Sequence, residues 1–448
     1  MAASAQDTIS PAGAVDPWPP AREAWTVAIL LMLANTLAFV DRQALALLVQ
    51  PIKKDLGASD TGMSLLYGLS FTMFYVLVGI PVARLADRSN RRNIIAGAVF
   101  IWSLATAICG MVRSFGTLFV ARVGVGAGEA GLSPAAYSLL ADYFPRERLA
   151  PAMGIYTMGT YLGGAAALLI GGLIATAIPP SSTIVVPVLG VLKGWHVVFL
   201  ALGVPGLILS ACLLSIREPI RRGATSEVAP LAVFFDHVGQ RKAAYFGIGI
   251  AFALMILVGN GTGAWIPAFF ERKFGWSTAE IGARYGTVVF FCGTGGALIG
   301  GFAASWLQRR YGRQGNLIAA VIGFSALVPL TIAFPLVGDP RVALGLIGAM
   351  NFFAGFNFGG GLASLQELTP NRMRALLSAG YMLMVNLVGA TMGPTVVALL
   401  TDYVFHDPQK LPEAISLSCA VFSPLAVVCL LIGSRGVAAA AALEPRSA

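Results

Sequence analysis

Long apolar runs follow one another along almost the whole chain, separated by short polar segments. A helix needs about 20 apolar residues to cross the hydrocarbon core of a bilayer, and these runs reach that length. Of the 448 residues, 57% are hydrophobic and 11% are charged, whereas a soluble domain carries about 25% charged residues. The sequence therefore predicts an all-α membrane protein with twelve transmembrane helices. We place them at residues 24–50, 60–86, 93–112, 115–143, 150–178, 195–216, 243–270, 279–307, 316–335, 341–368, 376–403 and 413–434.

Most Lys and Arg residues lie in the loops between these runs, so membrane orientation accounts for the net charge of +9 better than nucleic-acid binding does. An even number of helices puts both termini on one side. The loops on that side hold 19 basic residues and those on the other side hold 8. The positive-inside rule then predicts that both termini are cytoplasmic. Residues 1–21 lack the pattern of a cleaved signal, and we expect a disordered tail there.

The two halves of the chain repeat one another. Segment 145–148 (PRER), after the fourth run, is echoed by segment 370–374 (PNRMR), after the tenth, and Tyr156 corresponds to Tyr381 at an offset of 225. This repeat predicts two pseudo-symmetric six-helix halves, and such a layout is typical of transporters with a substrate site between the halves near the membrane midplane. A short surface helix is expected at Leu231–Gly239 in the connection. The expected organisation is a first half at 22–217, a cytoplasmic linker at 218–242, a second half at 243–435 and a C-terminal tail at 436–448.

Four charged residues interrupt the apolar runs of the first half. Arg42 shares a helical stripe with Asn35 and Phe39, so these three residues are expected to face the space between the halves and to bind substrate. Asp41 lies about 100° away and is expected to face a neighbouring helix. Ionisable residues inside a membrane usually mark an ion or substrate path. We therefore predict proton coupling at Asp41 and Glu129 and substrate binding at Arg42 and Arg122. The alternative is a static cluster of ion pairs that joins two helices.

The loop between the second and third helices resembles the signature loop of the major facilitator superfamily. Asp87, Arg88, Arg91 and Arg92 match it, whereas Ala83 and Asn90 replace the usual glycines. Within the superfamily, the chain resembles the spinster family of lipid transporters, through Asp41-Arg42, Gly128-Glu129-Ala130, Ser133-Pro134-Ala135 and Asp142-Tyr143-Phe144-Pro145.

The resemblance implies a bacterial transporter in the cytoplasmic membrane that moves lysophospholipid- or sphingosine-phosphate-like amphiphiles together with protons. It also implies a cytoplasmic gate formed by Asp87, Arg88 and Arg91, with Asp87 near the N-terminus of the eleventh helix, where the helix dipole favours a negative charge.

The second half has fewer deep charges than the first and supplies Phe and Met residues instead. A helical face with Phe352 and Phe356 suits the apolar tail of an amphiphile, although ordinary packing is the alternative. Tyr156 and Tyr381 complete the predicted substrate residues. Glu280 and Arg284, spaced i, i+4, are expected to pair locally near a helix end.

The Gly126–Gly131 segment has the GxGxxG pattern of dinucleotide-binding loops, but it lies inside a membrane helix, so close helix packing is the better interpretation. An enzyme is disfavoured, because the three histidines lie in no nucleophile or metal motif, and no cofactor or metal is predicted. The expected partners are a small amphipathic lipid substrate, protons and membrane lipids, with the chain acting as a monomer. A transporter of a hydrophilic organic anion or a drug remains open, and a polar wall where the tail would lie would favour it.

Overall fold

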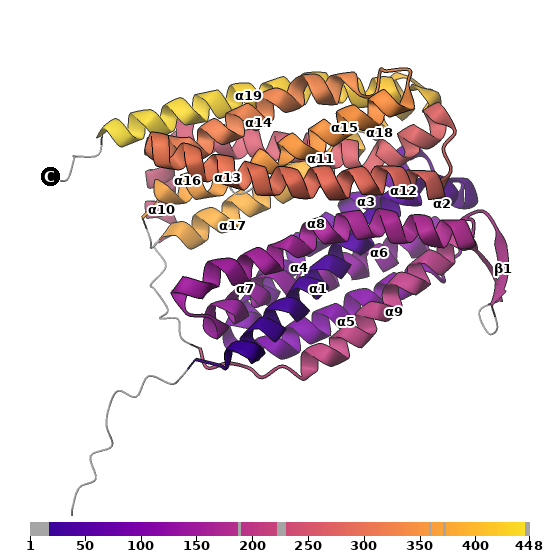
Figure 1. Cartoon of the computed structure of the whole chain (residues 1–448), viewed down its shortest axis with the longest axis horizontal. Helices are drawn as coiled ribbons and strands as arrows, with labels where there is room; N and C mark the ends of the chain where they lie inside the picture. Colours follow the sequence, from indigo (N-terminus) through magenta and orange to yellow (C-terminus); the bar gives the residue numbers. More distant parts are fainter. Residues whose placement is uncertain (1–17, 187–189, 222–229, 358–359, 371–372, 444–448) are drawn as a thin grey trace, which may run out of the picture.

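The computed structural model describes residues 18–443, apart from 187–189, 222–229, 358–359 and 371–372. Two helical bundles lie side by side, one from each half of the chain (Figure 1). The first half runs through α1 (Ala21–Leu47), α2 (Val49–Leu56), α3 (Asp60–Tyr67), α4 (Leu69–Arg88), α5 (Arg91–Cys109), α6 (Phe115–Glu129), α7 (Leu132–Tyr143), α8 (Arg146–Ala177), strands β1 (Thr183–Val186) and β2 (Gly190–Lys193), and α9 (Gly194–Leu214).

The second half follows the linker helix α10 (Leu231–Gln240), which fulfils the prediction of a short helix in this segment. Its elements are α11 (Lys242–Phe274), α12 (Thr278–Val288), η1 (Val289–Gly293), α13 (Thr294–Tyr311), η2 (Gly312–Gln314), α14 (Gly315–Ala333), α15 (Pro340–Ala354), η3 (Gly355–Asn357), α16 (Gly360–Glu367), α17 (Arg374–Met384), η5 (Val385–Thr391), α18 (Met392–Leu399), η6 (Leu400–Val404), η7 (Pro408–Lys410) and α19 (Leu411–Leu443).

The predicted fold of membrane helices in two halves is confirmed. Ten of the described helical runs are long and apolar enough to cross a membrane. The two other predicted passages, 115–143 and 341–368, are built from shorter pieces, because the first changes course at Ala130 and Gly131 and the second at η3. The β1–β2 hairpin, paired from Thr183↔Lys193 to Val186↔Gly190, was not expected from the sequence. We call the side of the molecule with this hairpin the hairpin side and the opposite side, where α1 begins and α19 ends, the terminus side (Figure 1).

Short polar residues start several helices next to the loops. Ser114 and Thr117 form a capping box at α6, and Ser277 and Glu280 form another at α12. In each box the side chains bond backbone N–H groups that the first helical turn leaves free. These caps fix the residue at which each of the two helices begins. The positions of the later residues along α6 and α12 follow from these starting points.

The two halves meet on the hairpin side. Asp60 of α3 is buried and accepts hydrogen bonds from both Nη atoms of Arg272 of α11, at 2.6 and 2.7 Å. Asp402 of η6 caps α3 by accepting from the Thr61 backbone N–H and hydroxyl, both at 2.7 Å. We call these contacts the hairpin-side latch. They hold segments that are more than 200 residues apart in sequence.

Glycines allow the halves to approach closely beside this latch. A Cβ on Gly172 of α8 would lie 2.9 Å from the Cα of Gly282 of α12, and a Cβ on Gly68 would lie 2.6 Å from the Thr391 carbonyl oxygen. Real Cβ atoms do not approach other atoms so closely. Small residues at such crossings let membrane helices come into backbone contact. The hairpin side is therefore tightly packed between α8 and α12, and between the end of α3 and η5.

On the terminus side, the linker is attached to both halves. Glu218 accepts from Arg91 Nε at 2.7 Å, which ties the start of the linker to the first half. At its other end, the His237 ring lies 3.1 Å from the Tyr245 hydroxyl of α11. Burial and the neighbouring Arg241 hold the pKa of His237 below its usual range. A neutral His237 keeps one ring nitrogen as a hydrogen-bond acceptor for these contacts.

Candidate functional site

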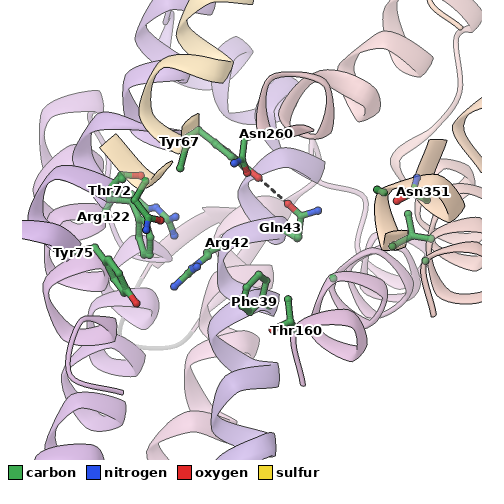
Figure 2. Close-up of a pocket in the computed structure, with 18 residues that line it drawn as sticks. Phe39, Arg42, Gln43, Tyr67, Thr72, Tyr75, Arg122, Thr160, Asn260 and Asn351 are labelled. Atoms are coloured by element: carbon green, nitrogen blue, oxygen red, sulfur yellow. Dashed lines mark hydrogen bonds between the residues drawn. The ribbon is translucent and has the colours of Figure 1, made fainter. Parts of the chain in front are cut away.

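A cavity of about 390 Å³ lies between the two halves (Figure 2). Residues from both halves line it, and most of them come from the middle of their membrane passages. The first half contributes Phe39, Arg42, Gln43, Tyr67, Phe71, Thr72, Tyr75, Arg122, Thr160 and Gly164, and the second half contributes Asn260, Val289, Gly293, Asn351, Ala354, Gly355, Asn386 and Ala390.

Arg42 of α1 reaches into this cavity and holds Glu129, which is the last residue of α6. The Arg42 Nε and Nη2 atoms lie 2.8 and 2.6 Å from the same Glu129 oxygen, Oε2. The Glu129 side chain is fully buried, whereas 29% of the Arg42 side chain is exposed. Both groups thus form one ion pair with its arginine on the cavity wall and its carboxylate behind it.

Aromatic rings surround the guanidinium of Arg42. Its Cζ atom lies 4.8, 4.5 and 5.4 Å from the ring centroids of Phe39, Phe71 and Tyr75. A cation over an aromatic face is attracted by about 0.5–2 kcal/mol, more where water is excluded. The rings therefore hold the arginine charge at the cavity even when its carboxylate is absent. Figure 2 shows Arg42 between Phe39 and Tyr75.

Glycine packing brings Glu129 to this position. A Cβ on Gly126 would lie 2.5 Å from the Phe71 carbonyl oxygen, and one on Gly128 would lie 2.7 Å from the Trp102 backbone nitrogen. The GxGxxG segment therefore serves close helix packing, as its place in an apolar run predicts. The second carboxylate oxygen of Glu129, Oε1, is buried and has no hydrogen-bond partner in the described part of the chain. A proton added to Oε1 would break no existing hydrogen bond.

Asp41 and Arg122 form the inner layer of the site. Asp41 faces α5 and accepts a hydrogen bond from the Thr106 hydroxyl at 3.0 Å, in the sideways orientation that its place on α1 predicts. Arg122 lines the cavity, and its Nη1 lies 3.4 Å from the Asp41 backbone oxygen. Its Nε is buried without a partner among the described residues. This N–H group is enclosed in the wall, where a donor is costly to leave unpaired.

The other predicted substrate residues of the first half lie behind the wall. Asn35 donates to the Tyr156 carbonyl oxygen at 3.0 Å and to the Thr160 hydroxyl at 3.1 Å, which joins α1 to α8. The Tyr156 hydroxyl lies 3.1 Å from the Ser133 hydroxyl. Neither residue belongs to the cavity lining in this conformation. Helical spacing identified their face of the helix but not the neighbouring helix that covers it.

Phe352, Phe356 and Tyr381 of the second half are also absent from the lining. A Cβ on Gly296 would lie 2.2 Å from the Phe352 carbonyl oxygen, so this face of α15 packs against α13. The Phe352 and Phe356 rings contact each other in a tilted arrangement, with centroids 5.7 Å apart. The Tyr381 ring lies 6.4 Å from that of Phe252. All three are partly buried outside the cavity lining in this conformation, and their substrate role stays a prediction.

Three asparagines from the second half line the cavity. Asn260 of α11, Asn351 of α15 and Asn386 of η5 line the second-half wall together with small residues. Sequence reasoning missed them, because a single amide in an apolar run is less conspicuous than a charge. The usable signal was the repeat, since Asn260 corresponds to Asn35 at the offset of 225.

The predicted gate residues lie at the terminus end of α4 and the start of α5. Arg91 is buried and bonds Asp142 of α7 at 2.5 Å and Glu218 at 2.7 Å, all within the first half and its linker. Arg88 is exposed. The Asp87 side chain lies outside the described residues. Elsewhere, Glu280 and Arg284 pair with each other at 3.3 Å, as predicted, away from the cavity lining.

Comparison with known proteins agrees with this architecture. The family model described as Major Facilitator Superfamily matches residues 31–394. An efflux pump of the same superfamily from Mycolicibacterium smegmatis is 31% identical over 92% of this chain and 93% of its own. A probable L-galactonate transporter of Escherichia coli is 24% identical over 74% of this chain and 73% of its own. A sphingosine-1-phosphate transporter of Mus musculus is 23% identical over 90% and 74%.

Among solved structures, a bacterial homologue of the human lysosomal transporter spinster, in an inward-facing and unoccupied conformation, has a TM-score of 0.74. It is 27% identical in sequence, and the match covers 95% of this chain and 98% of that chain. The chain thus belongs to the Major Facilitator Superfamily and is a multi-pass membrane transporter similar to the spinster proteins.

Proposed function

We propose that the protein carries an organic anion across the membrane by alternating access and couples this movement to protons. The observation that carries the proposal is the Arg42–Glu129 pair, in which the arginine faces the cavity between the halves and the carboxylate is buried behind it. An arginine on a cavity wall binds carboxylate and phosphate groups through its planar set of donors. The buried Glu129 carboxylate competes with a substrate anion for Arg42.

The coupling follows from this competition. An anion that enters the cavity and binds Arg42 displaces the Glu129 carboxylate from its only described partners, the Nε and Nη2 atoms. A buried carboxylate that loses its hydrogen-bonded counter-charge is unfavourable, and taking up a proton neutralises it. The free Glu129 Oε1 is a position where that proton would bond. Arg42 therefore exchanges its bond to Glu129 for a bond to the substrate when Glu129 is protonated.

Alternating access is supported by where the halves touch. The latch and the close glycine contacts lie on the hairpin side. With both termini in the cytoplasm, as the basic loops favour, this arrangement is closed to the outside and faces inward. The similar bacterial structure is also described as inward-facing. The similarity to a bacterial homologue of spinster supports placement in the cytoplasmic membrane of a bacterium. Residues of one chain from both halves form the described cavity lining, which supports a monomer.

The substrate class follows from the second-half wall. Each amide of Asn260, Asn351 and Asn386 donates one hydrogen to its own helix backbone, but an apolar tail would leave the three side-chain oxygens unpaired, and an unsatisfied polar group of this kind costs about 1–3 kcal/mol. Three amides among small apolar residues instead suit a hydrophilic organic anion. The similar transporter of E. coli is named for L-galactonate, which agrees with this class.

A second candidate is a lysophospholipid- or sphingosine-phosphate-like amphiphile. The aromatic rings of Phe39, Phe71 and Tyr75 around Arg42 favour it, because they offer apolar surface next to the headgroup site. The similar mouse protein is named for sphingosine-1-phosphate. The two candidates share the anionic group at Arg42 and differ in what lies beyond it.

Uptake into proteoliposomes tests the proposal. We expect an imposed pH gradient to change uptake of at least one of two probes, D-gluconate or lysophosphatidate, in the wild-type protein. Glu129→Gln and Asp41→Asn should fold but lose this pH dependence, whereas Glu413→Gln, which removes an exposed carboxylate on the hairpin side, should keep it. Wild-type pH dependence in both site variants would remove the carboxylates from the mechanism.

A further inference from the structure

The three asparagines of the second-half wall share one arrangement. Asn260, Asn351 and Asn386 each donate one amide hydrogen to the backbone carbonyl four residues earlier, at 3.2, 2.9 and 2.8 Å. This bond fixes each amide against its own helix. It also leaves the second amide hydrogen and the side-chain oxygen available, since an amide offers two donors and two acceptor lone pairs. None of the three oxygens accepts a hydrogen bond from the described residues.

The repeat provides a contrast for Asn260. Asn35 occupies the corresponding position to Asn260 in the first half, and there the amide bonds across to α8. Asn260 makes no such cross-helix bond in the described part of the chain and borders the cavity instead. The same residue type thus joins helices in one half and faces open space in the other.

The wall is also where the second half departs from regular α-helix. Asn386 lies in the π-helical segment η5, Val289 and Gly293 bound the π-helical segment η1, and Gly355 begins the 3-10 segment η3. All four residues line the cavity. Such interruptions inside helices occur frequently at functional sites, because they turn side chains and backbone groups out of the regular pattern. Three separate passages carry them.

We infer that the second-half wall is a hydroxyl-binding surface and that the substrate is a polyhydroxylated carboxylate. This inference rests on the proposed function, which supplies the anion site at Arg42 and Arg122. A hydroxyl both donates and accepts, so each open amide can form a reciprocal pair with it. The cavity of about 390 Å³ lies within the range for a small-molecule site of about 300–1,000 Å³. A carboxylate at the arginines would place the hydroxylated carbons of a short acid toward the three amides.

Matched pairs of acids test this inference on the purified, detergent-solubilised protein. D-Gluconate and hexanoate are six-carbon monoacids that differ in five hydroxyls, and D-glucarate and adipate are the corresponding diacids. Each amide–hydroxyl bond is expected to change affinity about 2- to 12-fold. The wild type should therefore bind at least one hydroxylated acid at least about tenfold more tightly than its deoxygenated partner.

The variants Asn260→Leu, Asn351→Leu and Asn386→Leu remove the amides one at a time. Each should weaken binding of the hydroxylated acid about 2- to 12-fold and change binding of its partner by less than about twofold. Thr262→Val is the matched control, because Thr262 makes the same backbone bond on α11 but is buried away from the cavity lining. It should keep the wild-type preference. Circular dichroism and size-exclusion profiles show which variants are folded.

The outcomes separate the inference from the proposed function. Equal affinity of the wild type for both members of each pair, or an unchanged preference in all three folded Asn variants, overturns the inference. Binding of lysophosphatidate with no binding of the hydroxylated acids also overturns it, and leaves anion transport in its amphiphilic form. If no anion binds at all, the proposed function fails as well.

Discussion

Arg42 is the residue on which the site depends, because it contacts the buried carboxylate and the cavity at once. Arg42→Lys keeps the positive charge but loses the planar set of donors. We expect this variant to bind anion more weakly than wild type and Arg42→Ala to bind more weakly still. Binding isotherms with D-gluconate and with lysophosphatidate measure this order. If Arg42→Lys binds as wild type does, the arginine acts as a point charge within the ion pair.

The ion pair also makes a prediction about stability. Arg42→Ala leaves Glu129 buried without its partner, and breaking one side of a buried pair costs about 3–5 kcal/mol. Replacing both residues, with Arg42→Ala and Glu129→Gln together, removes the stranded charge. The double variant should therefore be more stable than Arg42→Ala alone. Reversible unfolding in mixed micelles measures the free energy of unfolding of the wild type, the two single variants and the double variant. Additive effects of the two substitutions would show that the residues are not coupled.

Single residues differ in how well the sequence reveals them. Asp41, Arg42, Arg122 and Glu129 were recognisable because a charge in an apolar run is costly and conspicuous. The asparagines were not, since amides in membrane helices often bond only their own backbone. The predicted role of Phe352 and Phe356 at an apolar tail stays a prediction, because neither residue lines the cavity in this conformation. Helical spacing identifies a face, but the partner of that face depends on the long-range packing of helices.

At the scale of helices, the hairpin-side latch is the element that fixes the conformation. Asp60 receives two hydrogen bonds from Arg272 and one from Lys53, and the pair with Arg272 joins the halves. Charged hydrogen bonds contribute about 1.5–3 kcal/mol each. A coupling of about 3 kcal/mol changes the ratio of two states about 150-fold.

We expect Asp60→Asn to open the hairpin side more often. Spin labels attached at Gly116→Cys and Gly338→Cys report the distance between the two halves on the hairpin side. Both positions have room for a label, since a Cβ at either one meets nothing within 4 Å. The distribution should shift toward longer distances in Asp60→Asn. Glu413→Gln, which removes a local pair with Lys410 on the same side, is the control and should behave like the parent protein. Identical distributions for Asp60→Asn and the parent protein would mean that the latch does not hold this state.

Helices were easier to predict than their interruptions. Apolar length alone located the membrane passages, and the amphipathic linker segment located α10. The π-helical segments η1 and η5 have no comparable signal, because one extra residue per turn leaves the apolar composition unchanged. The latch was missed because its partners, Asp60, Arg272 and Asp402, sit near passage ends, where charges are ordinary.

At the scale of the whole molecule, the repeat predicted two halves, and the structure shows how they differ. The first half supplies the charges of the cavity, and the second half supplies amides and small residues. The conformation was beyond the sequence, because the same helices serve every state and only the contacts between halves change. Closed contacts on the hairpin side define the state seen here. We expect binding of an anion at Arg42 and of a proton at Glu129 to change the population of this state.

The most direct test of this account is proton exchange on binding. Wild-type protein in weakly buffered detergent solution is titrated with D-gluconate or with lysophosphatidate while a pH indicator records proton uptake. The account predicts uptake of up to about one proton per bound anion, because a displaced and buried Glu129 is neutralised. Glu129→Gln should bind anion without this uptake. Anion binding to the wild type with no proton uptake, or equal uptake in Glu129→Gln, would contradict the coupling of Arg42 and Glu129.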